Sequence, residues 1–117
     1  MSVQPGRYNI SLQRRADFYL QLQFKDSTGA PINLTGWGIY AQIWNKGRTT
    51  KHADFLVTPV NLALGTVKIS LTDVETAGLP CESFYDVLLE NPSEIKEYYL
   101  EGMIIASEGL TEIEIEP

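Results

Sequence analysis

The chain has 117 residues, the usual size of one domain with one hydrophobic core. Hydrophobic residues make up 44% of it and charged residues 21%, which is typical of a folded globular protein and excludes wholesale disorder. The net charge of −6 excludes the basic footprint of a nucleic-acid-binding protein. No apolar run reaches the roughly 18 residues needed to cross a bilayer, and the start of the chain lacks the apolar core of a signal peptide. We therefore expect a soluble protein made in a cytoplasm, with neither nucleic acid nor membrane as a partner.

The charge is unevenly distributed along the chain. Residues 1–52 contain seven of the nine basic residues and two acids, which gives +5, whereas residues 53–117 contain two basic residues and thirteen acids, which gives −11. Two interpretations are open. Either a basic face meets an acidic face of another copy, or the fold interleaves the two halves and scatters the charges.

Residues 1–6 are expected to form a flexible N-terminal arm, because Pro5 and Gly6 break any periodic pattern. Residues 8–12 alternate weakly and predict a first strand. The following stretches 18–24 and 37–44 alternate apolar and polar residues with a period of two, which is typical of strands buried on one face. A turn-rich segment separates these two strands.

The middle of the chain predicts a loop and two shorter strands. Residues 45–52 contain no apolar side chain and are expected to form an exposed, mobile basic loop. Residues 55–58 predict a short strand that Pro59 closes, which suits an edge strand or the end of a strand. After a turn, residues 66–71 predict a strand whose odd-numbered side chains point inward.

The second half predicts one helical turn and further strands. Thr72 and Glu75 match a capping box, which predicts a helical turn near 73–78. Residues 84–90 predict a central strand with Tyr85, Val87 and Leu89 pointing inward. Residues 97–106 predict the longest strand, in which Gly102 marks a bulge or a close backbone approach. Acidic and apolar residues alternate over 110–117, which predicts a C-terminal strand or arm that closes its own sheet or adds to a neighbour's.

Together these elements predict an all-β fold. Seven or eight short strands, with turns about every ten residues, favour an antiparallel β-sandwich with one short helical turn. We expect a single sandwich domain over residues 7–109, between the arm 1–6 and the segment 110–117.

The sequence offers no set of residues for catalysis, for a metal or for a cofactor. His52 and Cys81 are the only histidine and cysteine, so neither a zinc site nor a histidine-activated nucleophile is expected. No glycine belongs to a phosphate-binding loop. Cys81 is interpreted as a small, partly buried thiol, with a reactive or intermolecular cysteine as the alternative. We therefore expect a protein that is not an enzyme.

Aromatic residues are the remaining clue to function, because Trp, Tyr and Arg are enriched at interfaces. Tyr40 and Trp44 point away from the predicted core, and Tyr98 and Tyr99 must lie on opposite sides of their strand. Trp44 with Arg48 is either an interface anchor or a cluster packed under the basic loop; sugar binding by stacked rings is a third interpretation. The candidate protein interface comprises Tyr40, Trp44, Arg48, Lys51, Tyr99, Ile113 and Ile115.

The order of these motifs resembles a family of small bacteriophage virion modules, the N-terminal domain of phage baseplate upper proteins and related standalone tail proteins. The segments that carry the resemblance are 17–24, 26–36, 40–43, 65–71, 75–80, 85–90 and 100–102. The resemblance implies an immunoglobulin-like sandwich and a non-enzymatic assembly or adaptor role at a tail, baseplate or fibre connection. It also implies other virion proteins as partners, a homo-oligomer or multi-copy assembly, and a location in the virion. It supplies no active-site residues.

The chain ends at Pro117 without the receptor-binding or coiled-coil extension of long adaptor proteins, which favours a connector, baseplate accessory or capsid-decorating role. One alternative is therefore a capsid cement or decoration protein. Another is a carbohydrate-binding or host-surface-binding β-sandwich, for which exposed aromatic residues in one concave patch would be the signature. A small enzyme would instead need a cleft with two close carboxylates and a raised pKa.

Overall fold

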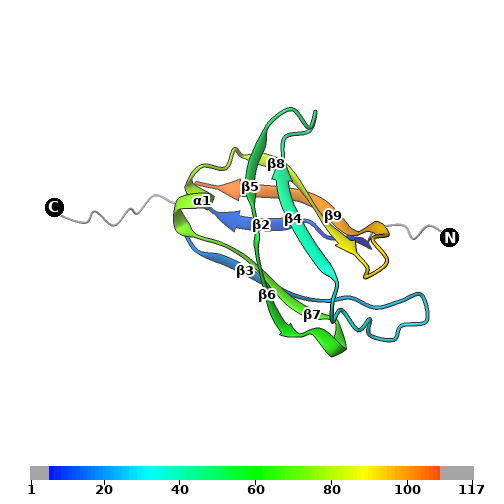
Figure 1. The fold of residues 1–117 in the computed structure, drawn as a ribbon. Helices are drawn as coiled ribbons and strands as arrows, with labels where there is room; N and C mark the ends of the chain where they lie inside the picture. The colour runs from blue at the N-terminus through cyan, green and yellow to red at the C-terminus, as the bar shows by residue number, and fades with distance from the viewer. Residues whose placement is uncertain (1–5, 109–117) are drawn as a thin grey trace.

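The structure is a computed structural model and describes residues 6–108. Two β-sheets pack face to face, and one helical turn lies at one end of the sandwich (Figure 1). The elements are β1 (Gly6–Arg7), β2 (Ile10–Gln13), β3 (Phe18–Gln23), β4 (Gly38–Trp44), β5 (Lys51–Asp54), β6 (Leu56–Asn61), the 3₁₀-helix η1 (Leu62–Leu64), β7 (Thr66–Leu71), α1 (Asp73–Ala77), β8 (Glu82–Glu90) and β9 (Lys96–Ser107). The predicted all-β sandwich is confirmed.

The larger sheet has the strand order β1-β9-β8-β4-β5, with β2 also paired to β9, and the smaller sheet has the order β3-β7-β6. When β1 and β2 are counted as the first strand and β5 is set aside, the smaller sheet holds the second, fifth and fourth strands, and the larger sheet holds the third, sixth and seventh. This is the order of an immunoglobulin-like sandwich. In that comparison β5 is the additional strand at the edge of the larger sheet.

The first strand departs from the predicted antiparallel arrangement. β1 and β2 pair with β9 in parallel, with Gly6 opposite Leu100 and Ile10 opposite Ile104. The register is the same in both segments, so β1 and β2 form one line that is interrupted only at residues 8–9. The larger sheet is therefore mixed. With β1 and β2 counted as one interrupted strand, the nine strand segments of residues 6–108 make eight strands.

Gly102 makes this interruption possible. A Cβ atom at position 102 would lie 1.9 Å from the carbonyl oxygen of Tyr8, so the chain can approach β9 this closely only opposite a glycine. The Tyr85 hydroxyl donates a hydrogen bond to the same carbonyl (2.6 Å), and burial raises the pKa of Tyr85 to about 12. The predicted close backbone approach at Gly102 is confirmed.

Asn9 supplies the hydrogen bond that the interrupted ladder lacks. Its Oδ1 accepts from the backbone N–H of Met103 at 3.0 Å. The predicted strand over 8–12 therefore begins only at Ile10, and Gly6, which was expected in the arm, already belongs to β1.

The core lies between the two sheets and follows the predicted alternation of β3, β4, β7 and β8. Tyr85, Val87 and Leu89 of the central strand β8 are buried, as expected. The largest fully buried apolar side chains are Leu34, Ile43, Ile69, Leu89, Ile104, Val67 and Val87. Because both sheets contribute to this set, burial of their inner faces is what holds the sandwich together.

The basic loop predicted at 45–52 is shorter in the structure. Asn45 closes a tight turn, since its Oδ1 accepts hydrogen bonds from the backbone N–H groups of Thr49 (2.8 Å) and Thr50 (3.1 Å). The last two residues of the predicted loop belong to β5, which pairs with β4.

β6 is an edge strand of the smaller sheet, as predicted for residues 55–58, but it continues to Asn61 instead of closing before Pro59. The register with β7 shifts between Pro59 and Asn61, which places the missing N–H of the proline at an irregularity of an edge. An edge strand can therefore contain this proline.

The capping box at Thr72 and Glu75 is confirmed. The Thr72 Oγ1 accepts from the Glu75 backbone N–H (3.2 Å), and the Glu75 Oε1 accepts from the Thr72 backbone N–H (2.9 Å). α1 is one turn long. Within residues 6–108, no helix is long and apolar enough to cross a membrane.

Candidate functional site

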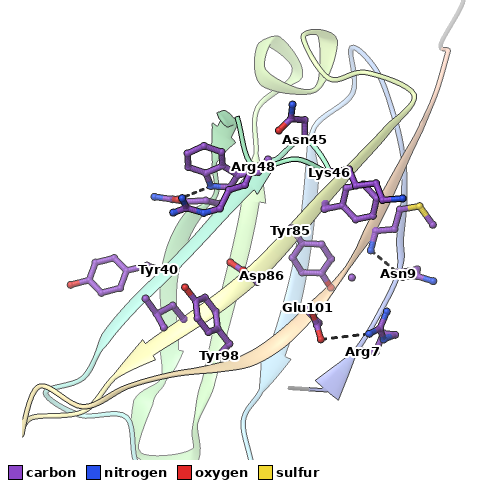
Figure 2. A pocket seen from close by; sticks show the side chains of 16 residues that line it. Arg7, Asn9, Tyr40, Asn45, Lys46, Arg48, Tyr85, Asp86, Tyr98 and Glu101 are labelled. Atoms are coloured by element: carbon purple, nitrogen blue, oxygen red, sulfur yellow. Dashed lines mark hydrogen bonds and ion pairs between the residues drawn. The ribbon is translucent and has the colours of Figure 1, made fainter. Parts of the chain in front are cut away.

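The outer face of the larger sheet is hollowed into a groove of about 510 Å³ (Figure 2), which we call the outer groove. Outward side chains of β4, β8 and β9 form its floor, and residues of β1 and of the β4–β5 turn line its rim. Its volume lies within the range of about 300–1,000 Å³ that is usual for sites of small ligands.

Three rows of side chains cross the outer groove, because directly paired residues of neighbouring antiparallel strands share a face. The rows, in the order β4, β8, β9, are Tyr40, Leu88 and Tyr98; Gln42, Asp86 and Glu101; and Trp44, Phe84 and Met103. Two rows of mainly aromatic and apolar side chains therefore flank one polar row.

Tyr40 and Tyr98 offer the most exposed rings of the groove, with 50% and 49% of each residue accessible. A Cβ atom at Gly38 would lie only 2.9 to 3.2 Å from the Oη, Cε2 and Cζ atoms of Tyr40, so the ring lies over the glycine. Figure 2 shows both tyrosines at the end of the groove opposite Arg48. The glycine thus leaves room for an aromatic ring against the strand.

At the other end, Trp44 and Arg48 contact each other. The guanidinium carbon lies 4.7 Å from the centre of the Trp44 ring, a cation–π geometry. The Trp44 Nε1–H donates to the Gln42 Oε1 at 2.9 Å. Trp44 is thus a partly buried wall of the groove with one ring face covered, and its contact with a partner remains a prediction.

Asp86 lies in the middle of the polar row. Within residues 6–108 its carboxylate has no hydrogen-bond or ion-pair partner, whereas Glu101 opposite it pairs with Arg7 at 3.6 Å. Partial burial raises the pKa of Asp86, and the charge of Glu101 raises it further, while Arg48 lowers it. A half-buried, unpaired carboxylate lowers the stability of the fold, and such groups cluster at functional sites.

The structure brings together only part of the predicted interface. Three of its residues line the outer groove, namely Tyr40, Trp44 and Arg48. Lys51 lies on β5 beside the groove and contacts Asp54 at 3.0 Å. Ile113 and Ile115 lie outside the described residues.

Tyr99 is corrected by the structure, because it points into the core. Its ring packs edge-on against Phe24, with centroids 6.2 Å apart. The adjacent residues 87 and 88 of β8 pair with Leu100 and Tyr98, so Tyr99 is an extra residue at a β-bulge. Tyr98 therefore takes the outward position that the interface prediction gave to its neighbour.

Sequence reasoning missed the polar residues of the groove other than Arg48. Asp86 was one visible signal, because it interrupts an otherwise apolar central strand. Arg7, Asn9 and Glu101 gave none, since the parallel pairing of β1 and β2 with β9 brings them together over more than ninety positions of sequence.

A second exposed surface lies on the smaller sheet. Tyr19, Ser70 and Leu56 form one row across β3, β7 and β6, and Tyr19 and Leu56 are 72% and 66% exposed. Val60, further along β6, is exposed as well. We call Leu56 and Val60 the apolar edge, because one side of β6 is unpaired among the described residues, and such sides can pair with another chain.

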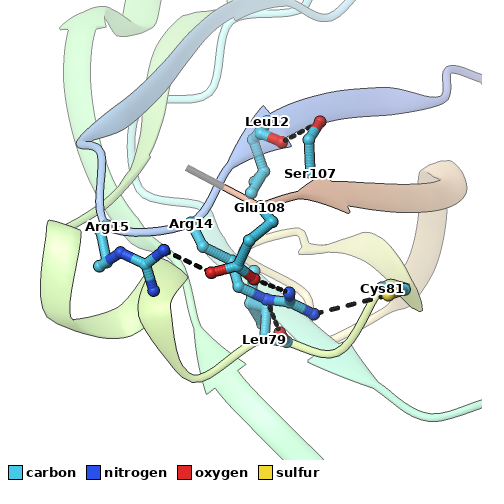
Figure 3. Close-up of polar contacts among 7 residues, drawn as sticks. All are labelled: Leu12, Arg14, Arg15, Leu79, Cys81, Ser107 and Glu108. Carbon is cyan, nitrogen blue, oxygen red and sulfur yellow. Dashed lines mark hydrogen bonds and ion pairs between the residues drawn. The ribbon is translucent and has the colours of Figure 1, made fainter. Parts of the chain in front are cut away.

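Within residues 6–108, four of the seven basic residues of the first half of the chain pair with acids of the second half, and Figure 3 shows two of them. Glu108 accepts hydrogen bonds from Arg14 (2.6 Å) and from Arg15, and these guanidinium groups hold the pKa of Glu108 below its ordinary value. Arg7 and Lys51 also pair with acids beyond residue 52. The fold thus interleaves the two charged halves, the second of the two interpretations of the charge distribution.

Cys81 is exposed, which corrects the expectation of a partly buried thiol. Its Sγ lies 3.7 Å from the Arg14 Nη2, as Figure 3 shows. Residues 6–108 contain no group of three or more His, Cys, Asp or Glu side chains that would hold a metal ion.

Comparison of the chain with models of protein families and with curated proteins finds no match. The assignment of a function therefore depends on the geometry of the two surfaces, on the strand order and on the resemblance of the motifs.

Proposed function

We propose that this chain is a non-enzymatic structural protein of a bacteriophage virion, which connects other virion proteins at the tail, the baseplate or a fibre. The resemblance of the ordered motifs to phage tail and baseplate modules is the reason for the virion assignment. The immunoglobulin-like strand order agrees with the fold that the resemblance implies.

The apolar edge is the observation that carries the assembly role. Within residues 6–108, no strand pairs with one side of β6, and Leu56 is two-thirds exposed although it is a large apolar residue. An extended segment of a partner can add to such an edge, with main-chain hydrogen bonds supplying affinity and side-chain contacts supplying specificity. Pro59 limits the pairing to the first half of β6, since it has no N–H to donate.

The arrangement of the carboxylates supports a role without catalysis. Glycoside hydrolysis uses two carboxylates that flank the scissile bond. Asp86 and Glu101 are instead neighbours in one row of one sheet face, and Arg7 is paired with Glu101.

The proposal is tested on purified virions of a phage that encodes the chain. We expect mass spectrometry to detect the protein in the particle, and we expect Leu56→Lys to reduce its incorporation because a charge would be buried against the partner. Tyr19→Lys is the matched control, since Tyr19 lies in the same row on the opposite strand of the sheet.

Absence of the protein from the particle would refute the virion role. Equal incorporation of Leu56→Lys and wild type would refute the role of the apolar edge in assembly. Cross-linking through Lys68, which lies opposite Thr58 of β6, then identifies the neighbour. Cross-links to the major capsid protein would favour the alternative of a capsid cement or decoration protein.

A further inference from the structure

The outer groove differs in chemistry from the centre of a protein interface. Its middle row contains Asp86 and Glu101, and the fully buried centres of protein interfaces are depleted in these residue types. A protein partner covering the groove would bury Asp86 completely, and within residues 6–108 Asp86 has no hydrogen-bond or ion-pair contact that would compensate its charge. The groove therefore suits a ligand that brings hydroxyl groups to the carboxylate.

Two side-chain amides of the groove have their orientation fixed by the protein. The Gln42 Oε1 accepts from the Trp44 indole (2.9 Å), and the Asn9 Oδ1 accepts from the Met103 backbone N–H (3.0 Å). In both residues the NH₂ group has no acceptor within residues 6–108 and is left to donate, and both residues line the groove.

The groove thus presents oriented donors near Asp86, an acceptor that has no hydrogen-bond or ion-pair partner among the described residues. A hydroxyl group both donates and accepts hydrogen bonds, so adjacent sugar hydroxyls can donate to Asp86 and accept from Gln42. Such ligands would satisfy groups that are otherwise left to water or unpaired.

The exposed rings supply the apolar part of the site. Tyr40 lies over Gly38 and is half exposed, and Tyr98 is exposed to the same extent in the same row. Aromatic walls with a few placed polar groups are the usual composition of ligand sites. Sugar rings combine apolar C–H faces with hydroxyl rims and match this alternation of rows.

We propose that the outer groove is a binding site for a neutral oligosaccharide. Neutral saccharides fit because the groove carries both signs of charge: Asp86 and Glu101 would repel an anionic chain, and Lys46 and Arg48 would repel a cationic one. The proposed role of the apolar edge in assembly neither requires this site nor is required by it.

The experiment is an NMR titration of the full ¹⁵N-labelled chain with maltohexaose, cellohexaose, xylohexaose, mannohexaose and chitohexaose. We expect at least one of them to give saturable shifts of backbone amides in β4, β8 and β9. Tyr40→Ala and Tyr98→Ala should each weaken that binding about tenfold, the effect of losing one important contact residue. Tyr19→Ala is the matched control and should bind like wild type, because Tyr19 is exposed on the smaller sheet.

Asp86→Asn separates a binding role from a structural one. We expect it to weaken binding while the folded state becomes more stable at neutral pH, a combination that loss of structure cannot produce. The proposal is overturned if no saccharide shifts the groove amides, or if both tyrosine variants bind like wild type. A parallel titration with an anionic hexuronic acid oligomer completes the test: binding of that oligomer alone would also overturn the proposal, since Lys46 and Arg48 would then select the ligand.

Failure of this site and failure of the assembly role remain distinguishable. Leu56→Lys should bind saccharide like wild type, because it lies on the other sheet. Tyr40→Ala should enter virions like wild type.

Discussion

The two sheets present outer faces that follow the same alternation, yet they leave different groups unsatisfied. On the larger sheet, aromatic rows surround Asp86, a half-buried carboxylate without a partner in the described residues. On the smaller sheet, Leu56 and Tyr19 are exposed apolar side chains, and Lys68 lies 5.9 Å from the centre of the Tyr19 ring. An unpaired polar group favours a polar ligand, whereas an exposed apolar edge favours another protein.

The N-terminal strand is what gives the larger sheet its groove. β1 and the kink at residues 8–9 bring Arg7 and Asn9 to the rim, and nothing comparable covers the smaller sheet in residues 6–108. The contrast between the faces therefore depends on the close approach at Gly102, and the largest expected effect comes from changing that residue.

Gly102→Ala should displace β1 and the kink from β9. The new Cβ would lie 1.9 Å from the Tyr8 carbonyl oxygen, which belongs to the backbone and cannot rotate away. We expect a loss of about 3 kcal/mol or more in the free energy of unfolding, measured by urea denaturation. Gly47→Ala is the control, since the nearest atom to its new Cβ is 3.9 Å away, and its effect should stay within about 0.5 kcal/mol. Equal stability of the two variants would show that the kink is not held by Gly102.

Sequence periodicity predicted the elements whose burial alternates. β7 has the predicted bounds of 66–71, and β3, β4 and β8 differ by one or two residues at their ends. Local chemistry also predicted the capping box before α1 and the close approach at Gly102. Each of these features depends on a residue and its near neighbours or on burial of one face.

Features that arise from long-range pairing escaped prediction. β5 contains no large apolar residue and forms because the Asn45 turn folds it onto β4. The bulge at Tyr99 shifts the alternation within one strand, so Tyr98 and not Tyr99 faces the groove. The polar row needs the register of β4, β8 and β9 together, which no single segment of the sequence specifies.

Asp86→Asn tests whether the groove lowers stability. The pKa of Asp86 is raised in the folded state, so its ionised form destabilises the fold, and this loss develops as the pH rises from the ordinary value of 3.8 through the raised one. We expect the variant to be more stable than wild type at neutral pH and to match it near pH 3, in thermal unfolding. Asp54→Asn is the control, because Asp54 is exposed and paired with Lys51. A less stable Asp86→Asn variant at neutral pH would mean that the carboxylate has a favourable partner, and the contrast between the two faces would fail.

The smallest effect is expected at the end of the sandwich, away from both surfaces, where Glu108 contacts Arg14 and Arg15. Its pKa is lowered in the folded state, so its contribution is present above the ordinary glutamate value of 4.5 and disappears as the pH falls through the lower folded value. Glu108→Gln should therefore lower the melting temperature slightly at neutral pH and leave it unchanged in strong acid. The neutral-pH effect is opposite in sign to that of Asp86→Asn. Because Glu108 is exposed, high salt should shrink the neutral-pH difference. A difference that persists in strong acid would assign the effect to lost packing, and any change in saccharide titration or virion incorporation would show that this end is coupled to one of the two faces.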